Sequence, residues 1–195
     1  QVEDQTLTDP RREPALHQGQ RGLQHGDPGD DQSEGDHQGV VLAEDTTVVA
    51  RVASRLEAAG LRGDDRLVVV HVSAGNEFRR WPEESFSTLI AALAQHDPRR
   101  RIIVASGPSD AEAARRVTDS ARARISTPDA LPPLLDWDLG ELRALIARAA
   151  VYIGGDSGPM HIAATTETPI VALLGPTLPE RSKPWRDPRL FSEMV

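Results

Sequence analysis

Residues 150–175 read AVYIGGDSGPMHIAATTETPIVALLG, and this stretch decides the fold. The apolar runs AVYIGG (150–155) and PIVALLG (169–175) are typical of strands buried on both faces, and a helix is predicted to begin between them near Gly158. A strand, a helix and a second strand in this order make one parallel crossover unit. The stretch therefore predicts an α/β sheet with parallel strands.

The same alternation of strands and helices continues toward the amino terminus. Apolar runs predict two further buried strands, LVVVHV (67–72) and RIIVAS (101–106), and a weaker strand is predicted over residues 124–126. Apolar spacing and capping residues predict a helix before these strands, which begins after Asp45 and ends at Gly60. They also predict helices between the strands: one from about Glu83, one capped by Ser109 with Glu112 in a capping box, and one over residues 139–148. This order predicts a Rossmann-like, doubly wound α/β domain with right-handed crossovers.

Composition divides the chain near residue 40. Residues 1–39 hold nine acidic and three basic residues, no aromatic residue and no regular apolar spacing, so we predict a disordered or non-native leader. Residues 40–64 are assigned to a linker helix, residues 65–187 to the Rossmann-like domain, and residues 188–195 to a tail.

The composition of the whole chain excludes several classes of protein. The 195 residues include no cysteine and carry a net charge of −8. A chain without cysteine has no disulfide framework, no thiolate zinc site and no cysteine nucleophile. A nucleic-acid-binding face would leave a surplus of basic residues, and a membrane helix would need an apolar run of roughly 18 residues. We therefore expect a cytoplasmic protein that does not bind nucleic acid.

The loop GGDSGPMH (154–161) follows a predicted strand, and ligands of such sheets bind at the carboxyl ends of the strands. Its glycines allow close backbone approach, and the first amides of the helix that begins near Gly158 favour an anion. Asp156 is a candidate acceptor for sugar hydroxyls, and His161 is a candidate donor to a phosphate. Alternatively, Asp156 or Ser157 only caps the helix and His161 is a surface histidine.

Two other strand-end loops carry charged residues. In SAGNEFRRW (73–81), Arg79 and Arg80 can neutralise a diphosphate, or they can form a solvated pair in front of a helix. In GPSDAE (107–112), a carboxylate beside the strand end can bind the vicinal hydroxyls of a ribose, although capping of the helix explains Glu112 equally well.

The tripeptide Asp136-Trp137-Asp138 superficially matches the D-x-D pattern that holds a divalent metal in one class of sugar transferase. Asp138, with Glu141 three residues later, fits the cap of the following helix better, so no metal site is predicted. Trp137 lies just outside that helix, where its ring can stack on a purine or pack beneath the loop.

Taken together, the motifs SAGxxxRRWPxxxF, SGPxDxE, GGDSGPMHIAA and TPIVALLGPT resemble the C-terminal half of glycosyltransferase family 9, the ADP-heptose:lipopolysaccharide heptosyltransferases. The resemblance covers approximately residues 65–185. It implies the two-domain GT-B fold, in which the C-terminal domain binds the nucleotide-sugar and the N-terminal domain holds most of the acceptor. It also implies transfer of heptose from ADP-heptose with inversion and without a metal or cofactor.

The resemblance further implies roles for individual residues. Arg79, Asp156 and His161 match residues that contact the diphosphate and the sugar of the donor, and they are the predicted catalytic residues. The other matches to donor-binding positions are Ala74, Gly75, Arg80, Gly107, Asp110, Glu112, Trp137, Ser157 and Gly158.

Some of these positions differ from the family pattern or leave alternatives open. Asp110 and Glu112 are alternative ligands of the ribose, and Trp137 falls near the adenine contact. Ala74 and Gly75 stand where hydroxyl side chains often help to hold phosphate, so side-chain contacts from these two positions are not expected.

The general base proposed for the family is an aspartate near the start of the N-terminal domain, and residues 1–64 offer no strand, glycine loop and aspartate in that order. We therefore expect the donor-binding half of a transferase, with the lipid-linked saccharide acceptor held by a missing N-terminal domain and any peripheral membrane contact confined to the full-length enzyme. The alternative is a noncatalytic nucleotide- or nucleotide-sugar-binding module. A nucleotide-sugar epimerase would need paired acid and base residues, which we do not find in the sequence.

Overall fold

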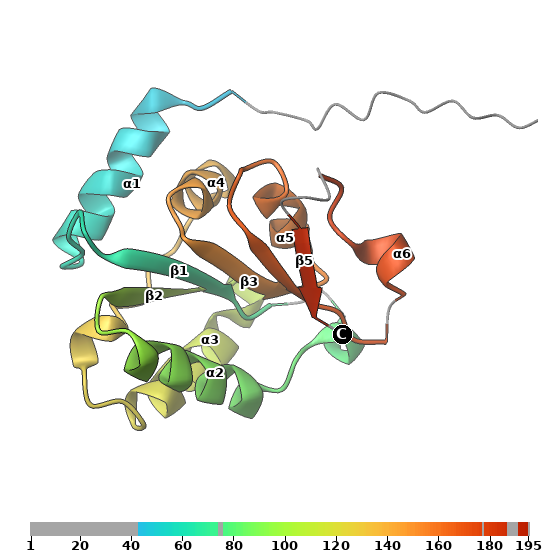
Figure 1. Ribbon diagram of the computed structural model, residues 1–195, viewed down its shortest axis with the longest axis horizontal. Coiled ribbons are helices and arrows are strands. Elements are labelled where there is room, and N and C mark those ends of the chain that lie inside the picture. Colours follow the sequence, from blue (N-terminus) through green and yellow to red (C-terminus); the bar gives the residue numbers. More distant parts are fainter. Residues whose placement is uncertain (1–42, 74–75, 177, 187–190, 195) are drawn as a thin grey trace, which may run out of the picture. The chain divides into compact units, whose positions relative to one another are not determined.

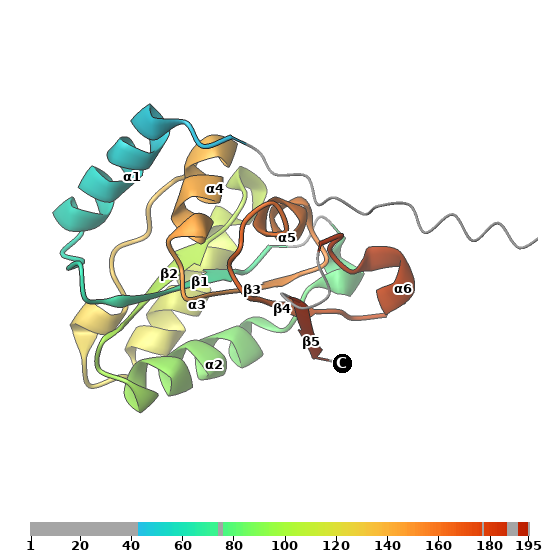
Figure 2. The same cartoon turned by 45° about the horizontal axis from the view of Figure 1, so that its top comes forward.

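The computed structural model describes residues 43–73, 76–176, 178–186 and 191–194 of the chain (Figure 1). The predicted leader, residues 1–39, lies outside the described residues, and so do Ala74 and Gly75. One parallel sheet with helices on both faces makes up the fold (Figure 2). None of the helices in the described part of the chain is long and apolar enough to cross a lipid bilayer.

Five parallel strands form the sheet in the order β2-β1-β3-β4-β5. They are β1 (Arg66–His71), β2 (Arg100–Ala105), β3 (Val151–Gly155), β4 (Ile170–Leu173) and β5 (Phe191–Met194). The first four strands fall on the predicted apolar runs, which confirms the doubly wound α/β fold. From β1 the chain moves outward to β2, then returns past β1 to β3 and continues outward on the other side.

One predicted strand is wrong, and one strand was missed. Residues 124–126 form no strand, because the amide of Arg124 closes a turn onto the carbonyl of Ala121 at the end of a helix and its guanidinium reaches Glu84. The strand β5 lies within the segment assigned to a tail, where it pairs in parallel with β4. It is too short to stand out as an apolar run in the sequence.

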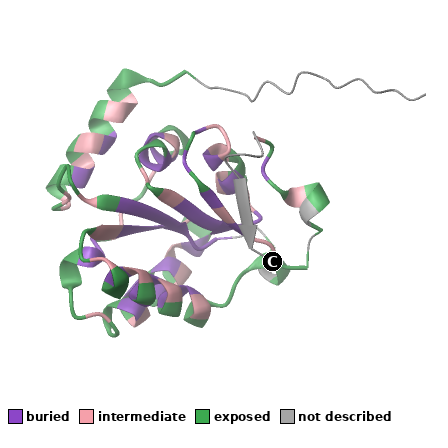
Figure 3. Ribbon diagram, in the orientation of Figure 1, coloured by how far each residue is buried: buried purple, intermediate pink, exposed green. Residues whose placement is uncertain are grey.

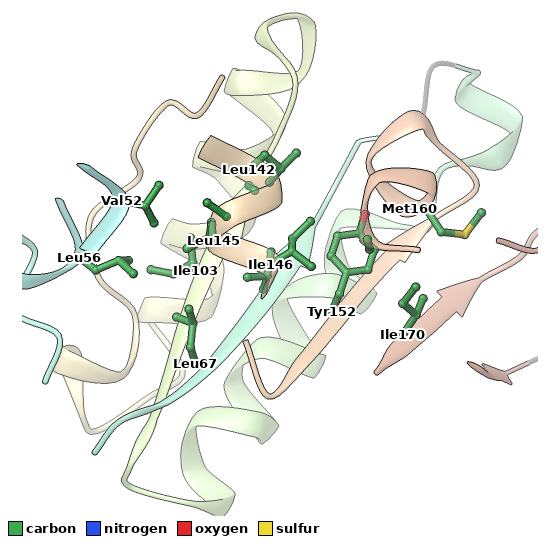
Figure 4. Close-up of a cluster of buried hydrophobic side chains, with 14 of the residues drawn as sticks. Val52, Leu56, Leu67, Ile103, Leu142, Leu145, Ile146, Tyr152, Met160 and Ile170 are labelled. Atoms are coloured by element: carbon green, nitrogen blue, oxygen red, sulfur yellow. The ribbon is translucent and has the colours of Figure 1, made fainter. Parts of the chain in front are cut away.

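The sheet carries a hydrophobic cluster on each face (Figure 3). On one face, side chains of the sheet pack against α2 (Glu83–His96) and α3 (Ala111–Arg122). On the other face, they pack against α4 (Leu139–Ala147) and α5 (Gly158–Ala163), as Figure 4 shows for Leu142, Leu145 and Met160. A short helix, α6 (Pro179–Ser182), follows β4. The alternation of side chains along each strand fills both clusters.

The helix α1 (Thr46–Ala58) belongs to the second cluster. The carboxylate of Asp45 caps it by accepting hydrogen bonds from first-turn amides, as predicted, and the chain leaves the helix through Gly60, whose φ is +89°. Val52 and Leu56 are buried in the cluster that contains α4 (Figure 4). The segment assigned to a linker therefore contributes to the hydrophobic core.

Candidate functional site

The sheet order defines a switch point between β1 and β3. The loop after β1 leads to α2 on one face of the sheet, and the loop after β3 leads to α5 on the other face (Figures 1 and 2). In open α/β sheets, ligands bind outside the carboxyl ends of the strands at such a point. This places the candidate site between residues 76–82 and residues 156–158.

An ion pair joins these two loops. Arg79 ends a short 3-10 helix (Glu77–Arg79), and its Nη1 lies 3.1 Å from Oδ2 of Asp156 at the end of β3. The Asp156 side chain is only 7% exposed, whereas that of Arg79 is 42% exposed. Oδ2 of Asp156 accepts no well-aligned hydrogen bond, so the contact is purely an ion pair. The structure thus brings together two of the predicted catalytic residues.

The next residue, Arg80, reaches the loop after β2, the strand on the other side of β1. Its Nη2 lies 2.9 Å from Oδ1 of Asp110, which follows β2 and is buried. Ser109 donates its hydroxyl to the other carboxylate oxygen of Asp110 (3.1 Å). The amide of Gly107 donates to the hydroxyl of Ser73 (2.9 Å), so the loops after β1 and β2 are tied together twice.

The predicted capping box of Ser109 and Glu112 is wrong. Residues 108–110 form a 3-10 turn, so Asp110 rather than Ser109 occupies the position before α3, and no side chain caps this helix. Glu112 pairs with Arg115, and its side chain is 75% exposed. Of the two candidate ribose ligands, Asp110 is held by Arg80 and Glu112 faces solvent.

The Gly-rich loop after β3 offers fewer free amides than the sequence predicts. Ser157 precedes α5 but does not cap it, because its hydroxyl donates to the carbonyl of Gly155 (3.2 Å). Pro159 has no amide, and the amide of Met160 donates to Ser157 (3.0 Å). Gly158 is the remaining residue of this turn with an amide, and the space beside its Cα is open.

His161, the other candidate phosphate ligand in this region, is exposed on the first turn of α5. The capping interpretation of Asp156 and Ser157 is wrong, since neither side chain caps this helix. The ion pair with Arg79 and the bond to Gly155 take the place of capping.

Two pockets flank the loop after β1. A pocket of about 220 Å³ lies between this loop and the end of β4, and its lining includes Phe78, Arg79, Arg80, Trp81, Leu173 and Gly175. A second pocket of about 310 Å³ lies on the β2 side, and its lining includes Val72, Arg80, Trp81, Ser109, Asp110 and Glu112. Trp81 lines both pockets and packs edge-on against Phe86, with ring centroids 5.0 Å apart.

Two residues of the first pocket, Phe78 and Gly175, were not predicted from the sequence. Phe78 is 79% exposed, and a side chain on Gly175 would approach the backbone of Phe78 and Arg79 at 3.7 and 3.8 Å. The sequence signal for Phe78 was an aromatic residue next to charged residues in a loop that follows a predicted strand. For Gly175, its place directly after a predicted strand was the signal.

Trp137 lies under an arginine of α1. The Arg55 guanidinium stands 4.3 Å from the centroid of the indole ring and donates to Glu141 (2.7 Å). Asp138 and Glu141 form the predicted capping box of α4, which explains the D-x-D tripeptide without a metal. Among the described residues, no three His, Asp or Glu side chains group in a way that could hold a metal ion.

The last residue of β1, His71, is buried. His71 is 2% exposed, and its Nδ1 has no hydrogen-bond partner. Desolvation by burial lowers the pKa of His71 to about 4, although a backbone hydrogen bond at Ser73 and the charge of Asp110 act in the opposite direction. The imidazole is therefore neutral at pH 7.

A parallel sheet with a switch point and cationic strand-end loops places this chain in the doubly wound α/β class, to which many nucleotide-binding domains belong. Comparison with known proteins narrows the class. The chain belongs to glycosyltransferase family 9 (heptosyltransferase), whose pattern matches residues 37–190.

Similarity to several named proteins supports this family assignment. Lipopolysaccharide heptosyltransferase 3 of Escherichia coli K12 is 33% identical over 138 residues, which are 70% of this chain and 38% of that protein. A family 9 glycosyltransferase of Veillonella parvula superposes with a TM-score of 0.69 at 24% identity, covering 80% of this chain and 43% of that one. The E. coli heptosyltransferase WaaC with ADP gives a TM-score of 0.57 at 21% identity, covering 77% and 43%. The chain thus spans less than half the length of these relatives, and it shares their GT-B domain fold.

Proposed function

We propose that this chain forms the donor-binding domain of a heptosyltransferase and holds ADP-heptose for inverting transfer to a lipopolysaccharide core-like acceptor. The position of Arg79 carries the proposal. Its half-exposed guanidinium stands at the switch point of a family 9 domain and on the wall of a pocket. A guanidinium binds phosphate oxygens through a fork of charged donors.

The other contacts follow from where the candidate residues lie. His161 is exposed on α5 and would approach the phosphates from the β3 side, together with the amide of Gly158. We assign the ribose hydroxyls to Glu112, because it is exposed on the wall of the second pocket and Asp110 is buried against Arg80. The choice of ADP follows the ADP in WaaC, with which this domain shares its fold.

We assign the adenine contact to Trp137. Arg55 covers one face of its ring, and the side chain packs against the cluster that contains α4, so a purine would reach the ring by displacing the guanidinium. A preference for adenine over other bases would be lost on removal of this ring.

In an inverting transfer, the acceptor oxygen attacks C1 of the sugar while the bond from C1 to the diphosphate oxygen breaks. Arg79 and His161 would stabilise the negative charge that develops on the leaving phosphate, so this step needs no bound metal. We assign the base that takes the acceptor proton, and the acceptor site itself, to a part of the enzyme outside this chain.

Calorimetry with ADP, UDP, GDP and adenosine tests the donor site. We expect ADP to bind most tightly of the three diphosphates. Arg79→Ala should weaken ADP binding about tenfold to a hundredfold, the loss of one charge-assisted contact, and should leave adenosine binding unchanged. Arg66→Ala, at the opposite end of β1, is the matched control and should alter neither affinity.

An equal loss of ADP and adenosine affinity in Arg79→Ala would show that this arginine supports the fold and does not grip the diphosphate. If the chain binds ADP but not ADP-heptose, the noncatalytic nucleotide-binding module is the better description.

A further inference from the structure

We infer that Arg79 and Asp156 exchange partners when the donor binds, so that the site favours a sugar diphosphate over the free nucleoside diphosphate. In the exchange, the diphosphate takes Arg79 and hydroxyl groups of the donor sugar take Asp156. This inference rests on the proposed function, because it concerns the same site.

Asp156 is incompletely paired in the free protein. This carboxylate is more than nine-tenths buried, and its Oδ2 accepts no hydrogen bond although Arg79 stands 3.1 Å away. The neighbouring Asp110 is equally buried but has both Arg80 and the Ser109 hydroxyl. A buried carboxylate with one unaligned partner can still accept donors from a ligand.

The second step is competition for Arg79. Its side chain is 42% exposed and borders the 220 Å³ pocket, so an anion can reach it from solvent. A diphosphate at Arg79 would bring two negative groups beside the Asp156 carboxylate, and like charges at this distance repel each other. The diphosphate therefore weakens the ion pair that Asp156 has in the free protein.

The third step concerns what replaces the arginine. Only the phosphates of ADP would lie at the end of β3, and they offer no sugar hydroxyl to Asp156. The Asp156 carboxylate would therefore be left buried without a full partner. The sugar of ADP-heptose carries hydroxyls that donate to a carboxylate. The hydroxyls of the donor thus replace the contact that Asp156 loses when Arg79 leaves, whereas the nucleotide product offers no such replacement. The ion pair between Arg79 and Asp156 forms again when the product leaves, and this favours product release.

A double-mutant cycle on the full chain tests the exchange. Calorimetry would measure ADP and ADP-heptose binding to the wild type, Asp156→Asn, Arg79→Ala and the double variant. We expect Asp156→Asn to bind ADP about twofold to fivefold more tightly, the range expected for one half-exposed ion pair, and to lose most of the preference for ADP-heptose over ADP. In the Arg79→Ala background, Asp156→Asn should tighten ADP binding clearly less, because only the charge repulsion is then relieved.

Asp65→Asn is the matched control, because the Asp65 side chain is buried and pairs with Arg101 at 3.1 Å, at the amino-terminal end of β1 away from the site. It should leave both affinities and their ratio unchanged. Thermal unfolding of each variant without ligand would confirm that it is folded.

The possible outcomes separate the two proposals. If Asp156→Asn tightens ADP binding equally with and without Arg79, simple charge repulsion explains the gain and the exchange is overturned while the donor site stands. An unchanged preference for ADP-heptose in Asp156→Asn overturns the exchange in the same way. If the wild type binds neither ligand, the proposed function and the exchange both fail.

Discussion

The hydroxyl oxygen of Tyr152 lies 2.5 Å from the point where a Cβ atom on Gly154 would stand. The two residues are two positions apart on β3, so they share one face of the sheet, and the Tyr152 ring lies over the glycine. Tyr152 is fully buried, and Figure 4 shows it within the cluster beneath α5. The first glycine of the GGDSG stretch, which lies within β3, is therefore required by packing.

Gly154→Ala should lower the free energy of unfolding by about 1–3 kcal/mol, because the new methyl group overpacks a filled site. Urea denaturation would measure the loss. Gly63→Ala is the control, since a side chain there meets nothing within 4 Å. The effect of Gly154→Ala should shrink in a Tyr152→Leu background, and an unchanged effect would show that the ring is not the cause.

Arg80→Ala should destabilise the protein more than Asp110→Asn does. The arginine substitution leaves a buried carboxylate without this cation, which costs about 1–3 kcal/mol, whereas the asparagine substitution acts on an arginine that is 43% exposed and whose charge water can reach. Urea denaturation of both variants measures the difference. Equal losses, or a greater loss in Asp110→Asn, would contradict this account of the pair.

Stability should fall as the pH is lowered from 6.5 to about 4, partly through His71. Its pKa is about 4 in the folded protein and 6.5 ordinarily, so in this window the unfolded chain binds a proton that the folded chain does not. The contribution amounts to roughly 2–4 kcal/mol and levels off below pH 4.

Denaturation of wild type and His71→Leu at several pH values would separate the contribution of His71 to the pH dependence of stability from that of the carboxylates. The variant should show a shallower loss of stability between pH 6.5 and 4. His96→Gln, at an exposed position on α2, is the control, and identical profiles for wild type and His71→Leu would refute the prediction.

Asp138→Ala should cost about 1 kcal/mol of stability through loss of the cap of α4. Asp136→Ala removes the same charge two residues earlier, but the Asp136 contact to Arg55 is made by its carbonyl oxygen and persists in the variant. That variant should stay within about 0.5 kcal/mol of wild type. Thermal unfolding of the two proteins distinguishes a cap from a general effect of acidic charge.

The strands and most helices could be predicted because their signals are local. The runs at 67–72 and 101–106 are β-branched and continuous, and the cap residues Asp45 and Asp138 lie next to the helices they begin. The strand β5 was missed because its formation depends on pairing with β4, which no local pattern announces. Capping by Ser109 was mispredicted because Asp110, held by Arg80, takes that position.

The sequence by itself determined the parallel α/β fold, the loops that carry the charged residues, and the resemblance to family 9, since each depends on neighbouring residues in the chain. Only the tertiary structure decided which carboxylate each arginine meets. Arg79 and Arg80 are adjacent, yet Asp156 and Asp110 lie 77 and 30 residues away from them. The partners follow from strand order, because β1 lies between β2 and β3 and its loop reaches both strand ends. Strand order is settled by packing across the whole sheet, which no short stretch of sequence encodes.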